Sequence, residues 1–153
     1  MIILVLNCGS SSLKYQLLDM KDQEVYDLLA KGLVERIGME VGCLKHQAEG
    51  KEKVVREMPI PDHTIGIKAV IDALLDKETG VLTTLEDIEA VGHRVVHGAE
   101  EFVCSQLITD KVVEQLSEFA DVIVDDDKSQ VSAYCSQRHP PTAASDNRRY
   151  PLP

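Results

Sequence analysis

The sequence predicts an α/β domain in which helices cover a face of a sheet. The first 58 residues alternate between strand-like apolar segments and short polar turns. Two later segments, 67–75 and 112–120, place apolar residues at helical spacing instead. A valine-rich segment at 90–98 lies between them and favours one more strand. Strands and helices mixed along one chain in this way are typical of an α/β fold.

The chain opens with a predicted hairpin. Residues 2–6 form an unbroken apolar run, which predicts a strand buried on both faces. The run ends in the small polar residues of 7–12, Asn-Cys-Gly-Ser-Ser-Ser. Apolar residues at 13, 15 and 17 then alternate with polar residues at 12, 14 and 16. We therefore expect a strand, a tight polar turn and a second strand.

The predicted turn carries groups that suit an anion. Ser12 and Lys14 are expected on one face of the second strand, about 6.6–7 Å apart along the chain. Gly9, Ser10 and Ser11 add backbone and hydroxyl donors, and the natural guest for such a cluster is a phosphate. The Walker A pattern is missing and no helix follows the turn. A Gly/Ser hairpin with an ordinary surface lysine remains an equal alternative.

Further elements follow from the same patterns. Strands are expected at 25–34, 41–48 and 53–58. The first helix has Asp62 or Thr64 as its N-cap and ends before Gly80. Residues 84–87 resemble a capping box that opens a short helical turn, and Asp110 is expected to cap the second helix. We interpret both helices as scaffold that covers the sheet.

The segment at 90–98 contains two histidines and an arginine. His93 and His97 would share a metal only on a helix, whereas a strand places them about 13 Å apart, so a zinc site is not expected. The strand instead gives Arg94 and Val96 a common face. A guanidinium suits a carboxylate or a phosphate, and the valine could touch a small apolar group of the same ligand. Taken alone, an ion pair between Arg94 and a surface acid is the better explanation.

Composition excludes several classes of partner. The 153 residues carry a formal net charge of −10, which argues against general binding to nucleic acid or to anionic membranes. The four cysteines (Cys8, Cys43, Cys104, Cys135) are scattered, so we expect reduced thiols. The apolar N-terminus is too short for a membrane span and has no basic flank of a signal peptide. A cytoplasmic location is the default expectation.

The pattern changes after about residue 120. Residues 129–153 are rich in Ser, Gln, Arg, Pro and Asn and show no periodicity. We expect a folded unit at 1–120 and a divergent, disordered or loosely packed tail at 121–153. The aspartates at 125–127 could bind Mg²⁺, but a solvated charge run is more common.

Two motifs together carry a family resemblance. Residues 7–15, Asn-Cys-Gly-Ser-Ser-Ser-Leu-Lys-Tyr, and residues 92–98, Gly-His-Arg-Val-Val-His-Gly, resemble the N-terminal part of the acetate/butyrate kinase family. Val-Glu-Arg-Ile-Gly at 34–38 adds to the likeness. The resemblance implies a ribonuclease-H-like domain of the actin/sugar-kinase superfamily, with a mixed sheet and flanking helices.

The resemblance also implies roles for individual residues. Asn7 would lie at the magnesium site, and Lys14 would serve the nucleotide phosphates together with Gly9. Arg94 would contact the acyl substrate, and Val96 would line the pocket for its methyl group. The hydroxyls of residues 10–12 would sit close to the transferring phosphoryl group, which makes Ser12 and Arg94 the expected catalytic residues.

The implied reaction is ATP plus acetate giving ADP plus acetyl phosphate, by in-line transfer with Mg²⁺. A propionate or butyrate kinase and a non-catalytic phosphate-binding fragment remain alternatives. The second domain of the family, which carries its other catalytic residues and most of its homodimer interface, has no counterpart here. We therefore expect a truncated chain with little or no kinase activity alone. One hypothesis for the tail is that it is read out of frame.

Overall fold

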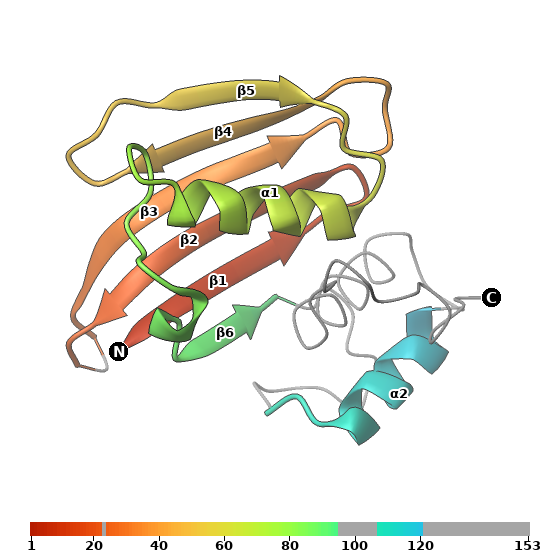
Figure 1. Ribbon diagram of the computed structural model, residues 1–153. Coiled ribbons are helices and arrows are strands. Elements are labelled where there is room, and N and C mark those ends of the chain that lie inside the picture. Colours follow the sequence, from red (N-terminus) through yellow and green to blue (C-terminus); the bar gives the residue numbers. More distant parts are fainter. Residues whose placement is uncertain (23, 95–106, 121–153) are drawn as a thin grey trace.

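A six-stranded sheet with a helix lying across it dominates the computed structural model, which describes residues 1–22, 24–94 and 107–120 (Figure 1). The elements are β1 (Ile2–Cys8), β2 (Ser12–Met20), β3 (Tyr26–Glu35), β4 (Gly42–Ala48), β5 (Val54–Met58), α1 (His63–Leu75), a 3-10 turn (Leu85–Asp87), β6 (Ala90–His93) and α2 (Asp110–Ala120). The strand order is β5-β4-β3-β2-β1-β6. β6 pairs with β1 in parallel, and the other neighbours pair antiparallel. The sheet is therefore mixed, as predicted.

The opening hairpin forms as the sequence predicts. β1 and β2 pair antiparallel, with Asn7 opposite Lys14. A turn joins them, in which the backbone N–H of Gly9 donates to the carbonyl oxygen of Ser12 at 2.8 Å. The residues at 13, 15 and 17 are buried, whereas Lys14 and Gln16 are exposed. The predicted alternation of β2 is confirmed.

β1 departs from the prediction on one face. Leu4, Leu6 and Cys8 are buried against the core, but Ile3 and Val5 on the other face are only half-buried. The prediction of a strand buried on both faces is therefore wrong for the second face. An apolar run alone does not distinguish these cases, because both give the same sequence pattern.

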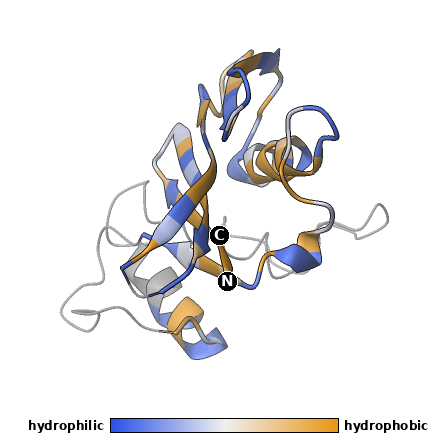
Figure 2. Cartoon of the chain, turned by 90° about the vertical axis from the view of Figure 1, so that its left-hand side faces the viewer, coloured by the Kyte–Doolittle hydropathy of each residue, from blue (hydrophilic) through white to orange (hydrophobic). Residues whose placement is uncertain are grey.

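The hydrophobic core lies between the sheet and α1. Ile67, Val70 and Leu74 of α1 are buried together with Leu13 and Leu17 of β2. Figure 2 shows the helix on one side of the sheet. Each such side chain contributes roughly 1.5–3 kcal/mol when it is fully removed from water. This packing orients the side chains at the alternate β2 positions toward the opposite face.

α1 begins where a carboxylate caps it. Asp62 is the N-cap, and its Oδ1 accepts from the backbone N–H of Ile65 at 2.9 Å. This resolves the alternative between Asp62 and Thr64 in favour of Asp62. The helix ends at Leu75, before Gly80 as expected. Asp87 accepts from the backbone N–H of Thr84 at 2.9 Å, which bears out the predicted capping interaction.

The two later elements require corrections. The predicted strand at 90–98 is seen as β6, Ala90–His93, and residues 95–98 lie outside the described residues. α2 begins at Asp110, but Thr109 caps it: its Oγ1 accepts from the N–H of Val112 at 3.4 Å. The prediction of Asp110 as N-cap is wrong, because the preceding threonine provides the capping oxygen. Asp110 instead places its charge in the first turn, where the helix dipole favours an anion.

A buried polar contact crosses β3. The hydroxyl of Tyr15 on β2 lies 2.5 Å from Nδ1 of His46 on β4. Gly32 of β3 pairs with both residues, and a Cβ there would come within 2.4 Å of the Tyr15 ring and of the Lys45 carbonyl oxygen. The strand therefore needs glycine at this position, and the tyrosine ring occupies the freed space.

Among the described residues, no helix is long and apolar enough to cross a membrane.

Candidate functional site

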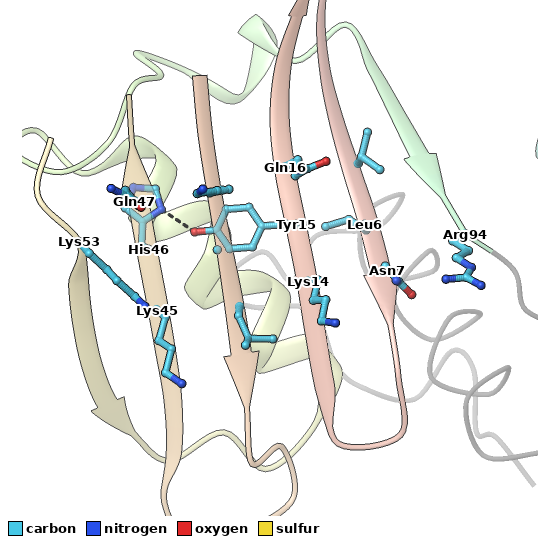
Figure 3. Close-up of a pocket in the computed structure, with 14 residues that line it drawn as sticks. Leu6, Asn7, Lys14, Tyr15, Gln16, Lys45, His46, Gln47, Lys53 and Arg94 are labelled. Atoms are coloured by element: carbon cyan, nitrogen blue, oxygen red, sulfur yellow. Dashed lines mark hydrogen bonds between the residues drawn. The ribbon is translucent and has the colours of Figure 1, made fainter. Parts of the chain in front are cut away.

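The face of the sheet opposite α1, here called the open face, carries the candidate site. A broad concavity of about 650 Å³ lies over it. Its lining includes five cationic side chains and three amides: Lys14, Lys31, Lys45, Lys53, Arg94, Asn7, Gln16 and Gln47 (Figure 3). The chain as a whole is strongly acidic, so this lining concentrates positive charge on one face.

Asn7 and Lys14 form the centre of the expected phosphate site. They are directly opposite each other on β1 and β2, so their side chains share one face of the sheet. Both line the concavity. Ser12 lies two residues before Lys14 and therefore on the same face, opposite Glu35 of β3.

Arg94 reaches the same face from a distant part of the chain. β6 runs parallel to β1 with His93 opposite Leu6, and the backbone N–H of Arg94 donates to the Leu6 carbonyl oxygen at 3.1 Å. Arg94 therefore lies beside Asn7, and its exposed side chain lines the concavity with Lys14 (Figure 3). The structure thus places the predicted lysine and arginine on one side of the sheet.

Neither of these two cations is neutralised locally. Lys14 and Arg94 have no ion pair with a carboxylate among the described residues. Lys45 differs, because it is hydrogen-bonded to Glu35, and this bond holds the pKa of the Glu35 carboxyl below its usual range. Among the described residues, Lys45 is thus the one cation of this lining that is paired with a carboxylate.

The serine turn differs in part from the expectation. The backbone N–H of Gly9 is used inside the turn and is not a donor for a ligand. Ser10 and Ser11 are exposed at the tip, and Ser12 is half-buried at the start of β2. None of these serines is among the described residues that line the concavity.

The described residues contain no group of three or more His, Cys, Asp or Glu side chains that could hold a metal ion. Asn7 offers a single amide oxygen and has cations on both sides. Mg²⁺ often binds through one or two protein groups, several waters and substrate phosphates. These residues therefore fit a magnesium ion that arrives on a nucleotide, and they do not fit a resident metal site.

Two predicted residues, Val96 and His97, lie outside the described residues. Sequence reasoning missed three lining residues, Lys31, Lys45 and Lys53. Alternation within each strand was the available signal for these lysines. The pairing register of the sheet then places position 45 in line with Lys14 across β3. That register was not known from the sequence alone.

Comparisons with known proteins agree on one family. The model of the Acetokinase family matches residues 2–135. The acetate kinase of Caldanaerobacter subterraneus subsp. tengcongensis is 54% identical over 122 residues, which cover 80% of this chain and 30% of that protein. The acetate kinase of Clostridium kluyveri is 53% identical over 118 residues, which cover 77% of this chain and 28% of that protein. The chain thus spans about three tenths of the length of these relatives.

Solved structures give the same result for the fold. The Porphyromonas gingivalis acetate kinase superposes with a TM-score of 0.82 at 38% identity, over 92% of this chain and 35% of that one. A propionate kinase from Francisella tularensis subsp. tularensis SCHU S4 gives a TM-score of 0.73 at 30% identity, over 91% and 34%. The predicted fold class, a ribonuclease-H-like mixed sheet of the actin/sugar-kinase superfamily, is confirmed.

Proposed function

The chain belongs to the acetokinase family, and from this premise we propose that its protein transfers a phosphoryl group between ATP and a short-chain carboxylate, acetate first among them. The observation that supports the proposal most is the placement of Lys14 and Arg94 on one face, beside Asn7. This chain contributes one wall of the site. The activity is proposed for the whole protein, because the relatives are about three times longer.

The open face suits the electrostatic problem of this reaction. Acetate is ionised at neutral pH, so it needs little help from a base. The barrier comes largely from repulsion between an anionic nucleophile and an anionic phosphate. A cation about 4 Å from an anion contributes roughly 4 kcal/mol near a protein surface, so two unpaired cations offset much of that repulsion. Positioning for in-line transfer supplies most of the rest.

Each residue takes a role that its position allows. Lys14 binds the nucleotide phosphates as a point charge, and Arg94 holds the carboxylate through two parallel N–H donors. Asn7 offers its amide oxygen to the Mg²⁺ that arrives with ATP, and that ion neutralises charge on the phosphates when bound. Ser12 and the exposed hydroxyls of Ser10 and Ser11 border the transferring phosphoryl group.

Gly9 and Val96 complete the proposed site. Gly9 contributes by shaping the turn, since its N–H is already used there. Val96, which follows Arg94 by two residues and lies outside the described residues, is assigned to the pocket for the acyl methyl group on the family resemblance. A longer acyl chain is the second candidate for the substrate, and the likeness to a propionate kinase favours it. We expect the 153-residue chain alone to have little kinase activity, since it covers three tenths of the length of its relatives.

A chimera tests the proposal on this chain's own residues. Residues 1–120 replace the matching segment of the Caldanaerobacter acetate kinase, and acyl phosphate is trapped as the hydroxamate with acetate, propionate or butyrate. We expect an active chimera that prefers acetate and loses at least tenfold in kcat/KM with Lys14→Gln or with Arg94→Gln. Lys68→Gln on the exposed side of α1 is the matched control and should leave kcat/KM unchanged. A folded but inactive chimera, or one indifferent to both substitutions, would contradict the proposal.

A further inference from the structure

A buried histidine on the core side of the sheet is hydrogen-bonded to the turn between β1 and β2. His63 is the first residue of α1 and is 8% exposed. Its Nε2 lies 2.7 Å from the carbonyl oxygen of Gly9, at the start of the turn. A carbonyl oxygen only accepts, so this geometry requires a proton on Nε2. We propose that His63 is a positioning residue, which fixes the serine turn for phosphate binding without touching the ligand.

The contact comes from the core side of the sheet. The side chain of Cys8, next to Gly9, is buried on that side, and burial raises the pKa of its thiol to about 12. Lys14 points the other way, into the concavity. His63 therefore acts on the turn's backbone from the opposite face and cannot reach a ligand over Lys14.

A second tether from outside the hairpin is also present among the described residues. It is the backbone N–H of Ile37, which donates to the carbonyl oxygen of Ser11 at 3.0 Å. Ile37 is buried, and its Cδ1 lies 3.5 Å from where a Cβ would stand at Gly66 of α1. The turn is thus fixed at both ends by groups that pack with the N-terminal half of α1. His63 makes its tether through a side chain, whereas Ile37 uses its backbone, so a substitution at His63 removes the first and leaves the second.

The effect of the tether on nucleotide binding rests on the proposed function. A displacement of about 1 Å at a catalytic site costs on the order of a hundredfold in rate, so a small shift of the turn has a large effect. The tether itself does not rest on that function, because it exists without a ligand. The tether and its effect on nucleotide binding can therefore be tested separately.

The first test needs no ligand. The ¹⁵N shifts of the His63 ring in the 153-residue chain should show a proton on Nε2. His63→Leu should then accelerate amide exchange at Gly9 by roughly fivefold to tenfold, the usual worth of one hydrogen bond. His63→Gln keeps an N–H donor and should exchange nearly as slowly as the native chain. An unprotonated Nε2, or equal exchange of the Gly9 amide in His63→Leu and His63→Gln, would overturn the tether. If His63→Leu fails to fold, the ¹⁵N measurement of the ring decides.

The second test adds tripolyphosphate with Mg²⁺ and follows the amide shifts of residues 9–14. His63→Leu should weaken binding at least fivefold, and His63→Gln should restore it. Asp62→Ala, which weakens the same helix end but leaves His63 in place, should bind like the native chain. If the native chain gives no shifts, the proposed function fails while the exchange result stands. If His63→Leu binds as the native chain does, the positioning role is wrong.

Discussion

Gly32 shows how one residue determines the local structure of the sheet. Tyr15 crosses β3 at this glycine to reach His46, whose Nε2 contacts the Thr79 carbonyl oxygen at 3.0 Å. Burial raises the pKa of the Tyr15 hydroxyl, so it stays protonated and donates to Nδ1 of His46. Two strands, β2 and β4, and the segment after α1 are thereby joined across β3 by one buried polar chain. Lys14 is the direct neighbour of Tyr15, so this chain also fixes the strand that carries it.

Gly32→Ala tests this close packing. The added methyl group would meet the Tyr15 ring and the Lys45 carbonyl oxygen, and overpacking of this kind costs about 1–3 kcal/mol. Urea denaturation should show that loss with an unchanged slope. Gly92→Ala is the control, since among the described residues its Cβ would meet Val5 alone, at an ordinary 3.9 Å. Equal stability of the two variants would show that Tyr15 does not pack over Gly32 in this way.

His46 predicts a dependence of stability on pH. Burial lowers the pKa of its ring below the ordinary value of 6.5, so the unfolded chain binds a proton more readily than the folded one. The free energy of unfolding should therefore be nearly constant between about pH 7 and 8 and fall as the pH drops through 6.5 toward the folded pKa. The lowered pKa values of Asp76 and Glu35 affect the free energy of unfolding only at lower pH, where carboxyl groups titrate.

Urea midpoints between pH 5 and 8 provide the measurement. His46→Gln should flatten this part of the curve, because it removes the titrating ring and keeps a polar side chain. If His46→Gln kept the pH dependence of the native chain, the effect would belong to another histidine.

At the scale of elements, α1 is the helix that the sequence defines best. Its apolar face at 67, 70, 71, 74 and 75 could be predicted from spacing alone, and these positions are buried or, at 71 and 75, partly buried. The N-cap was narrowed only to Asp62 or Thr64. We expect Asp62→Ala to lower the free energy of unfolding by about 1 kcal/mol, because one helix N–H loses its acceptor. Asp72→Ala should have a much smaller effect, since its ion pair with Lys68 is exposed. Matched urea titrations would refute the cap if the two effects were equal.

Other elements show where sequence reasoning ends. Strand alternation correctly assigned the two faces of β2, because its period is local. The lysines of β3 and β4 come next to Lys14 because of the pairing register between the strands. No local pattern encodes that register, which also shifts between Leu17 and Leu18. The contact between His63 and Gly9 joins residues 54 positions apart and left no local signal. Thr109 was missed because both it and Asp110 are acceptable caps.

At the scale of the whole molecule, charge is distributed unevenly. The chain carries a net charge of −10, yet its open face gathers five cations. α1 covers the other face and fixes the alternation, so the lysines cannot turn inward. The family resemblance alone would indicate the same residues. The parallel pairing of β6 with β1 adds the physical reason why Arg94, eighty residues after Lys14, lies on the same face.

The binding of acetyl phosphate with Mg²⁺ to the 153-residue chain tests that arrangement most directly, because its phosphoryl end is assigned to Lys14 and its acyl end to Arg94. Titration followed by the amide shifts of residues 7–14 and by the Arg94 Nε–H signal should give one saturable curve for both. Lys14→Gln and Arg94→Gln should each weaken binding about tenfold, while Lys68→Gln leaves it unchanged. Shifts confined to one of the two sites, or binding that survives both substitutions, would contradict a single anion site shared by β2 and β6.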